Sequence, residues 1–542
     1  MKKIVTPILI FITYCCVAQS EWQWVYNFDY QADDYIEDMV IDCDGNIYAI
    51  CKIGQEPLVI SGDTIFSHNG YAPSGILIKL DSDSNLKWVK TFAGTYGISE
   101  SALEIDNEKN IYVAFSAINY YVIDTIEFFS ETNCLNISKF DSNGNLLQLF
   151  QYPNVTHVVS LFISASKDIY FCGYCSRYFS LGDFVFDPSH EIGKTEVFVA
   201  KIDSVGNPLW LNCISGISWE MINDLEGDNI DNLYVVGRFE SPKVYIGDTI
   251  LINCNSDTTK YDIFIVKYNY LGDILWAKRL GESMNETGES ITIDNDNNIV
   301  LSGNFESYNL NFNDTVLIGG AGCQNTFIIK FDNSFNRIWG KSFEGYTNNA
   351  AKALVVDTNG NTYVSGIYAF SLSVDGFVIH SLGGIDNYIA RINTTGKVDT
   401  LFNVGGIGYE LITELNYDTF GNLIIAGRTD SPTNEFGDLI IYNDSIETLD
   451  IFIAKFSFLS NIFNCLETSK FSIFPNPTST SFTIKSETYP ANVNIFDLNG
   501  KPVKSIEDYS GENIDVADLQ KSVYFVKLIA DDKISVGKLV VE

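Results

Sequence analysis

A short unit recurs along most of this chain of 542 residues, and its recurrence limits the fold more than any other feature. The clearest copy runs from Val356 to Gly366 and reads VDTNGNTYVSG. Aligned on the residue that closes its turn, the copies end at Asn46, Asn110, Asp168, Asn232, Asn298, Asn361 and Asn422. The spacing is about 58 to 66 residues, and recurrence at a near-constant period is the sequence signature of repeat architectures. The chain is therefore predicted to be a repeat protein.

Each unit contains two turns with strands around them. An Asp opens the first turn in the best copies and Gly precedes the closing Asn, so the Asp side chain can cap free N–H groups while Gly and Asn accept positive φ. The apolar run that follows, such as Leu423–Ala426, is too short for a helix and is predicted to be a strand covered on both faces. A later strand carries one basic residue per unit: Lys79, Lys139, Lys201, Lys267, Lys330, Arg391 and Lys455.

These recurring basic residues have two interpretations. They could form a ring that binds an anion. Each also lies two residues before an Asp or its replacement, where a long side chain can lie along apolar surface and form a local ion pair. We prefer the second interpretation.

Four strands per unit at this period predict the blades of a β-propeller. We expect an all-β chain, with a seven-bladed β-propeller over residues 20–463, built from four-stranded blades plus inserted hairpins. The segment Trp22–Phe28 resembles a fourth strand without a third, and the last unit lacks its fourth strand. The N-terminal strand is therefore expected to pair with Ile451–Phe456, which would close the ring and remove two exposed edges.

The N-terminus indicates export. Met1–Lys3 is basic, Ile4–Val17 is apolar and Ala18 supplies a small residue near the cut, so residues 1–19 are predicted to be a signal peptide. No other run approaches the ~20 apolar residues of a membrane span, so no transmembrane segment is expected. Tyr14 before Cys15 is too bulky for a lipid-attachment site.

Composition excludes several functions. With 34 Lys and Arg against 69 Asp and Glu, the formal charge is −35, which repels nucleic acid and anionic membranes. The 4 His residues do not have metal-ligand spacing, so no His-based metal or catalytic site is predicted. Cys172 and Cys175 have the spacing of a redox or zinc pair, but no second pair accompanies them, and they are interpreted as strand residues. No cofactor is predicted, although the acidic chain leaves calcium open.

The tail differs from the repeats. After a short linker at residues 464–470, Phe471–Thr478 reads FSIFPNPT, Val493–Lys501 reads VNIFDLNGK, Val523–Lys527 reads VYFVK and Lys538–Val541 reads KLVV. In this order the motifs resemble the type A C-terminal sorting domain of the type IX secretion system. The matching residues are Pro475, Asn476, Pro477, Gly500, Lys501, Tyr524 and Lys538. Ser522 departs from the pattern, because the family usually has Gly there.

This resemblance implies a small β-sandwich over residues 471–542 that is recognised by the type IX secretion machinery. It also implies export through the periplasm to the outer cell surface or the medium. The repeat region resembles bacterial secreted β-propeller repeats, a family that brings no assigned chemistry.

Two functions remain open. The first is a binding or adhesion module for an extracellular glycan or protein. The second is a secreted carbohydrate-active enzyme, a glycoside hydrolase or lyase, although the sequence identifies no pair of catalytic carboxylates. The connections between units vary, and variation of this kind belongs to loops on a rigid scaffold. The aromatic residues in them are the predicted ligand-binding residues: Tyr96, Trp219, Tyr346 and Tyr409.

Overall fold

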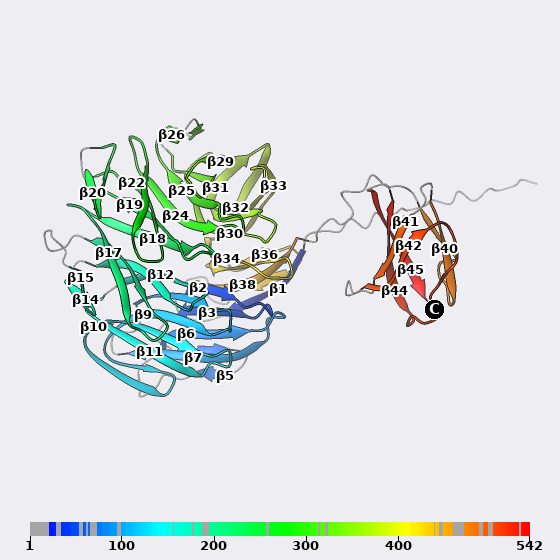
Figure 1. Ribbon diagram of the computed structural model, residues 1–542, viewed down its shortest axis with the longest axis horizontal. Coiled ribbons are helices and arrows are strands. Elements are labelled where there is room, and N and C mark those ends of the chain that lie inside the picture. The colour runs from blue at the N-terminus through cyan, green and yellow to red at the C-terminus, as the bar shows by residue number, and fades with distance from the viewer. Residues whose placement is uncertain are drawn as a thin grey trace, which may run out of the picture. The chain divides into compact units, whose positions relative to one another are not determined.

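The computed structural model describes residues 21–28, 34–53, 58–60, 63–65, 73–94, 99–155, 157–175, 178–186, 195–255, 259–312, 315–319, 323–437, 439–443, 448–458, 471–486, 491–496, 502–530 and 533–541. These residues form strands and contain no helix, so none of them forms a helix able to cross a membrane. The predicted signal peptide, the predicted linker, Tyr96, Gly500 and Lys501 lie outside the described residues. The chain divides into two compact units, one spanning Trp22–Ser457 and the other including Phe458–Glu542 (Figure 1).

In Trp22–Ser457 the strands pair into antiparallel four-strand groups. The groups are β2 (Tyr35–Ile41), β3 (Ile47–Lys52), β6 (Pro73–Leu80) and β7 (Leu86–Gly94); β8 (Ser99–Ile105), β9 (Ile111–Ile123), β10 (Ile126–Phe140) and β11 (Leu146–Pro153); β12 (His157–Ile163), β13 (Ile169–Cys175), β16 (Glu196–Ile202) and β17 (Pro208–Ser215); β18 (Glu220–Gly227), β19 (Leu233–Phe239), β22 (Asp262–Tyr268) and β23 (Ile274–Leu280); β24 (Glu286–Ile293), β25 (Ile299–Phe305), β28 (Asn325–Phe331) and β29 (Arg337–Gly345); β30 (Asn349–Val356), β31 (Thr362–Val374), β32 (Phe377–Ile392) and β33 (Val398–Gly406); and β34 (Glu410–Tyr417), β35 (Asn422–Thr429), β38 (Asp450–Ser457) and β1 (Glu21–Phe28).

Short hairpins are inserted between the second and third strands of most groups. They are β4 (Leu58–Ile60) with β5 (Asp63–Ile65), β14 (Phe179–Leu181) with β15 (Phe184–Phe186), β20 (Lys243–Ile246) with β21 (Thr249–Ile252), β26 (Asn309–Phe312) with β27 (Thr315–Ile318), and β36 (Thr433–Phe436) with β37 (Leu439–Tyr442). In the remaining two groups the long pairs β9–β10 and β31–β32 extend into the same position.

The four-strand groups follow one another around a common centre (Figure 1). Their first strands contact each other in the order β2, β8, β12, β18, β24, β30 and β34, and β34 in turn contacts β2. Each group packs its side chains against the next in an apolar core. The Trp22–Ser457 unit is therefore β-propeller-like.

The first strand of the chain joins the last group. β1 lies beside β38 in the sheet order β1-β38-β35-β34, which confirms the prediction that Trp22–Phe28 pairs with Ile451–Phe456. The Trp22 ring packs edge-on against Phe456 with ring centroids 4.9 Å apart and against Phe436 at 5.0 Å. Aromatic pairs of this geometry stabilise beyond their buried area.

The Asp that opens the first turn is fully used as an acceptor. Oδ1 of Asp357 accepts from the backbone N of Asn359 at 2.9 Å and of Asn361 at 2.8 Å. Its Oδ2 accepts from Nδ2 of Asn361 at 2.8 Å and from the Tyr363 hydroxyl at 3.1 Å. The same set recurs at Asp42, Asp106 and Asp228. The predicted capping role of this Asp is confirmed.

Turns that lack Gly keep the same backbone. Lys109, Lys167, Asp231 and Asn297 hold φ of 64, 67, 62 and 60° at the position where Gly360 has 81°. Residues with a Cβ rarely adopt this left-handed conformation, and the closing hydrogen bond is retained there, as from Lys109 N to Asp106 O at 2.8 Å. The sequence changes strain these turns without changing their type.

The recurring basic residue is structural, but the sequence suggested the wrong partner. Lys330 Nζ lies 2.7 Å from Oδ2 of Asp294, which opens the first turn of its own group, and not beside Asp332 two residues further on. Lys455 pairs in the same way with Asp418, whereas Lys201 pairs with Asp168, which closes the first turn of its group. The two residues meet because they lie on adjacent strands. Lys330 in β28 is the register partner of Val300 in β25, and Val300 lies two residues after the end of the first turn.

Some of these basic residues also tie neighbouring groups together. Lys79 Nζ and Trp88 Nε1 both donate to the carbonyl of Ser142 in the next group, at 2.9 and 3.2 Å. Lys201 with Trp210 and Lys455 with Trp24 repeat this arrangement on Tyr270 and Ser82. The ammonium groups of these lysines already donate to carbonyls of the neighbouring group. These lysines therefore stabilise the packing between groups and do not form a ring that binds an anion.

The C-terminal unit contains two sheets. One has the order β39 (Ser472–Phe474), β40 (Ser481–Lys485), β43 (Ile514–Asp515), and the other β42 (Pro502–Tyr509), β41 (Ala491–Phe496), β44 (Ser522–Ala530), β45 (Lys533–Val541). Both sheets contribute to one apolar core, including Phe482 and Ile514 from the first and Val526 and Leu539 from the second.

Replacing Asp357 by Ala tests the importance of the first turn. In Asp357→Ala the buried backbone and side-chain donors of this turn lose their hydrogen-bond acceptor. The substitution is therefore expected to lower the free energy of unfolding by about 2 to 4 kcal/mol. Urea unfolding followed by tryptophan fluorescence measures the change. Asp332→Ala is the matched control, because Asp332, in the turn between β28 and β29, accepts similar bonds in an exposed place. An equal loss in both variants would contradict the importance of burial.

Candidate functional site

A cavity of about 440 Å³ lies where the first strands of the groups meet. All its lining residues come from β2, β8, β12, β18, β24, β30 and β34. Because these strands form a closed circuit, we call this cavity the axial channel.

A β-bulge in each first strand shapes the channel. The register with the second strand shifts between Ile36 and Asp38, and equivalent shifts occur in the other first strands. Bulges bend a strand and redirect its side chains. Each bulge inserts one additional residue into its strand. The inserted residues that line the channel are Glu37, Val159, Asn223, Glu289, Lys352 and Thr413.

The channel is acidic. Asp38, Glu104, Asp224, Glu226 and Glu414 line it, each partly open to the channel and otherwise surrounded by protein. Burial raises the pKa of Asp38 to about 7 and the pKa of Glu104 and Glu226 to about 8. Burial also raises the pKa of Asp224 and Glu414, and nearby carboxylates add to the rise for Glu414. Groups of this kind can exchange protons near neutral pH.

Two of these carboxylates link adjacent groups. Oδ2 of Asp38 accepts from the backbone N of Leu103 at 2.7 Å. Oδ2 of Asp224 accepts from the backbone N of Ile291 at 2.9 Å and from Oγ of Ser290 at 2.8 Å. The channel acids therefore also hold the first strands to one another.

The channel residues were not predicted from the sequence. They lie in the middle of the first strands, at a position where the residue type changes from one unit to the next. This position is Asp38, Asp224 or Glu414 in three units and Ser160, Ser290 or Ala353 in three others. The sequence feature that points to these channel residues is the presence of polar residues within strands that are otherwise covered on both faces.

Three of the predicted ligand-binding residues can be placed. Trp219, Tyr346 and Tyr409 lie in the connections β17–β18, β29–β30 and β33–β34. Trp219 is 42% and Tyr346 77% exposed, whereas Tyr409 is half-buried. The carbonyl oxygens of Trp219 and Tyr409 accept backbone bonds from Glu240 and Asp430, which begin the inserted segments.

These three aromatic residues share a face but not a pocket. The bonds to the inserted segments place them on the side of the inserted hairpins, opposite the tight turns. They belong to different groups, and Tyr346 packs edge-on against Phe370 at 5.9 Å. They therefore lie at separate places on this face.

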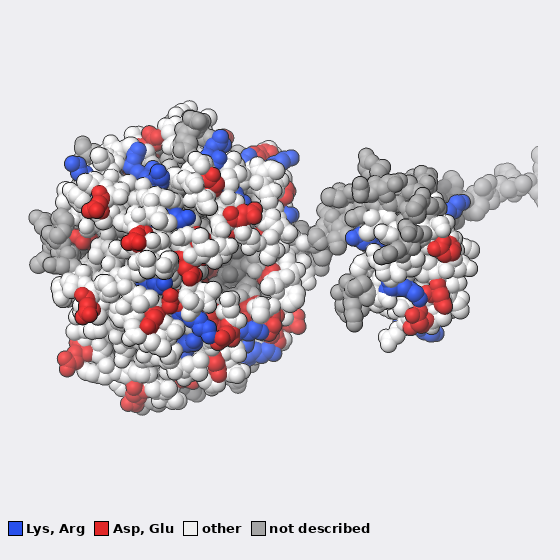
Figure 2. All heavy atoms as spheres, viewed as in Figure 1, with Lys and Arg blue, Asp and Glu red and all other residues white. Residues whose placement is uncertain are grey.

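The Cys172 and Cys175 pair lies in the described part of the chain. Cys172 and Cys175 are buried in β13, and burial raises the pKa of Cys172. Among the described residues, no group of three or more His, Cys, Asp and Glu side chains is placed to hold a metal ion. On the face shown in Figure 2, acidic and basic side chains of the Trp22–Ser457 unit are interspersed and do not form a patch of one sign.

The sorting motif ties the start of the C-terminal unit to its last strand. Asn476 Nδ2 donates to the carbonyl of Lys538 at 2.5 Å, and Asn476 Oδ1 accepts from the backbone N of Val540 at 2.8 Å. Pro475 and Pro477 flank this Asn. Tyr524 is buried and its hydroxyl donates to the carbonyl of Gln520 at 2.8 Å. Lys538 is exposed.

Comparison with known proteins identifies the tail. Residues 472–542 match the family described as secretion system C-terminal sorting domain, which confirms the resemblance to the type IX sorting domain. An uncharacterized WD repeat-containing protein, L264, of Acanthamoeba polyphaga mimivirus is 21% identical over 467 residues, covering 70% of this chain and 33% of the relative. The chain thus spans about a third of the length of this relative.

Similarity to solved structures is weak. An apocarotenoid oxygenase of Synechocystis covers 81% of this chain and 93% of its own at 11% identity and a TM-score of 0.37. A Bacteroides caccae protein of unknown function covers 60% and 89% at 10% identity and 0.32. PorZ, a surface component of the type IX secretion system of Porphyromonas gingivalis, covers 96% and 100% at 10% identity and 0.18. At such TM-scores none of them indicates an activity.

The raised pKa of Glu104 predicts a pH effect. The pKa is about 8 in the folded chain against an ordinary value of 4.5. The folded state therefore binds this proton more tightly, so stability falls as pH rises from about 5 to about 8. Glu104→Gln removes the charge and is expected to raise the free energy of unfolding at pH ~8 by about 1 to 3 kcal/mol, with little effect at pH ~5.

Urea midpoints at the two pH values measure this effect. Glu131→Gln is the control, because Glu131 is exposed. The same response from both variants would mean that the channel does not perturb Glu104.

Proposed function

Because this chain carries a type IX sorting domain and is exported to the cell surface or the extracellular space, we propose that it is a secreted binding protein built on a seven-bladed β-propeller. Its ligand is an extracellular glycan or protein. In this proposal residues 1–19 are the signal peptide, 20–463 the propeller, 464–470 a linker and 471–542 the sorting domain. The four-strand groups and the closed circuit of their first strands support the count of blades.

The distribution of connections carries the binding proposal. One face consists of short turns whose Asp side chains are used in internal bonds, as at Asp357. The opposite face has inserted hairpins and connections of different content, with Trp219 and Tyr346 exposed. Exposed aromatic side chains stack on sugar rings and anchor protein partners. Loops that vary on a rigid scaffold are the usual place for recognition.

The axial channel favours a second candidate, a secreted carbohydrate-active enzyme. Asp38, Asp224 and Glu414 are close enough for their charges to interact, and each has a raised pKa. Such carboxyl groups can act as general acids on a glycosidic bond. Incubation of the purified chain with polysaccharides separates the candidates, because an enzyme releases reducing ends or unsaturated products and a binding protein only retains the polymer.

Deletion of residues 471–542 tests the export route. The truncated chain is expected to accumulate in the periplasm, because the type IX machinery recognises the tail. Fractionation and immunoblotting of cells and medium measure the distribution. The matched control is the full chain with Lys521→Ala, an exposed substitution outside the sorting motifs. Unchanged surface or medium levels of the truncated chain would refute the sorting role.

Substitution of the aromatic residues tests the binding face. A variant with Tyr96, Trp219, Tyr346 and Tyr409 replaced by Ala is expected to bind at least about tenfold more weakly, because several anchors are lost together. Glycan arrays and surface-protein pull-downs identify the ligand, and calorimetry measures the affinity. The control replaces the exposed Val205 and Phe420 on the turn face. Intact binding in the first variant with loss in the control would place the site on the turn face.

A further inference from the structure

A cavity of about 250 Å³ lies beside the axial channel, where the last four-strand group meets the first. Its lining residues are Tyr35, Ile36 and Glu37 of β2, Thr413 of β34 and Arg428 of β35. Glu37 and Thr413 also line the axial channel, so the two spaces adjoin. We call this cavity the side pocket.

The side pocket lies toward the face of the inserted hairpins. Arg428 is close to the end of β35 that is remote from the tight turn, and Tyr35 begins β2. Tyr409, one of the predicted ligand-binding residues, is nearby in the fold. Its backbone N donates to Oδ1 of Asp430 at 2.6 Å, and Asp430 lies two residues after Arg428. The pocket therefore belongs to the face that we propose for binding.

The charge of Arg428 has no partner in the protein. Its guanidinium lies over the Tyr35 ring, with Cζ 4.4 Å from the ring centroid. Arg428 is half-buried, and its Nε has no hydrogen-bond partner among the described residues. Arg428 forms no ion pair with Glu37 or with another residue of the described part of the chain. An arginine stays charged in proteins, so burying part of it without a partner is costly.

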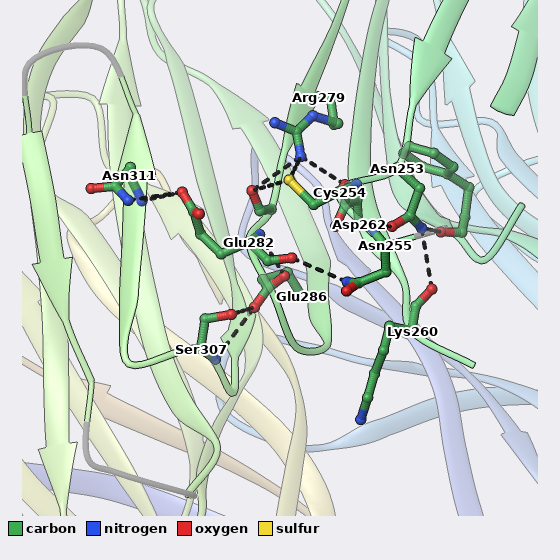
Figure 3. A network of polar contacts seen from close by, with 12 residues as sticks. Asn253, Cys254, Asn255, Lys260, Asp262, Arg279, Glu282, Glu286, Ser307 and Asn311 are labelled. Carbon is green, nitrogen blue, oxygen red and sulfur yellow. Dashed lines mark hydrogen bonds and ion pairs between the residues drawn. The ribbon is translucent and has the colours of Figure 1, made fainter. Parts of the chain in front are cut away.

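A second half-buried arginine shows how this unit uses the side chain for structure (Figure 3). Arg279 Nη1 donates to Oδ2 of Asp262 at 2.8 Å and to the carbonyl of Gly281 at 3.1 Å. Its charge is therefore neutralised by a buried acid of the adjacent strand. Arg428 has no such acid beside it.

The same two positions are satisfied internally in the fifth group. Strand register makes Asn304 the equivalent of Arg428 and Glu289 the equivalent of Thr413. Nδ2 of Asn304 donates to Oε1 of Glu289 at 2.8 Å, and its Oδ1 accepts from the backbone N of Ala351 at 2.8 Å. In the last group, Oγ1 of Thr413 is buried and has no hydrogen-bond partner among the described residues. Two unpaired polar groups therefore line the side pocket where another group has a bonded pair.

The chemistry of these side chains fits a planar anion. A guanidinium stacked on an aromatic ring keeps the donors at its edge free for a ligand in its plane, and its fork matches a carboxylate. The Thr413 hydroxyl adds a donor, and Glu37 adds an acceptor. A single sugar ring that carries a carboxylate offers both an anion and hydroxyl donors, and it suits a pocket of about 250 Å³.

An acidic polypeptide fits the side pocket less well. It would bring a run of carboxylates against a chain whose formal charge is −35. A glycan can place neutral rings on both sides of one acidic ring. The combination of one cation with an acceptor therefore favours a sugar over a peptide.

We propose that the side pocket binds a uronate, a sugar residue with a carboxylate, of an extracellular glycan. The Arg428 guanidinium and the Thr413 hydroxyl donate to the carboxylate, and Glu37 accepts from a ring hydroxyl. Tyr35 holds the guanidinium in place. This inference rests on the proposed binding function and names its ligand class.

Calorimetry with oligogalacturonate tests the side pocket on the purified full chain, with a cello-oligosaccharide as the neutral probe. The chain is expected to bind oligogalacturonate more tightly than the neutral probe. Arg428→Met is expected to weaken this binding at least about tenfold, because the charged fork is lost. Its urea midpoint is expected to stay unchanged, because no hydrogen bond within the protein is lost. Thr413→Val keeps the shape and is expected to weaken binding about threefold or more.

Arg238→Met is the matched control. Arg238 has the equivalent position in the fourth group and stacks on Tyr261 at 4.5 Å, but its Nη2 contacts Sδ of Met221 at 3.2 Å. The control is expected to bind oligogalacturonate like the parent chain. The proposal is overturned if the parent does not bind oligogalacturonate, if Arg428→Met binds it as tightly as the parent, or if Arg238→Met loses as much affinity.

Two further probes identify other anions. Tighter binding of dextran sulfate or of poly-L-glutamate than of oligogalacturonate would also overturn the proposal, because the ligand would then be a sulfate ester or an acidic protein. Retention of neutral glycans or surface proteins by a chain that does not bind oligogalacturonate would reject the uronate site alone and leave the proposed binding function standing.

Discussion

Closure of the circuit of four-strand groups is the constraint on which the rest of the structure depends. Each group packs only against its neighbours, so an open array would leave an unpaired strand edge and an uncovered apolar face at each end. The pairing of β1 with β38 removes both edges at once. Packing of Trp22 against Phe436 and Phe456 then fixes the end of the chain in the last group.

A closed circuit also concentrates charge. First strands that meet around a centre bring their inward side chains together, and the bulge in each strand directs polar residues such as Asp38 and Glu414 into the channel. The acidic channel depends on closure, since it is assembled from groups that are distant in sequence.

The sequence predicted what repeats and failed where one unit differs from the next. Turn chemistry, the four strands of each unit and the pairing of Trp22–Phe28 follow from residues that recur or are missing at the ends. The partner of Lys330 was wrong, because neighbouring strands bring Asp294 closer than the nearer residue in sequence. The channel acids were missed, because residues such as Asp38 and Glu414 come together only when groups distant in sequence close the circuit.

The order of the strands has a consequence for timing. Asn27 and Tyr442 are 415 residues apart, yet Asn27 Nδ2 donates to the Tyr442 carbonyl at 3.4 Å. The strand that a ribosome and a translocon deliver first must therefore wait for the strand that arrives almost last. Until then the chain exposes two sheet edges, and contacts of such long sequence separation form slowly. The circuit of groups can therefore close only after β38 has been delivered.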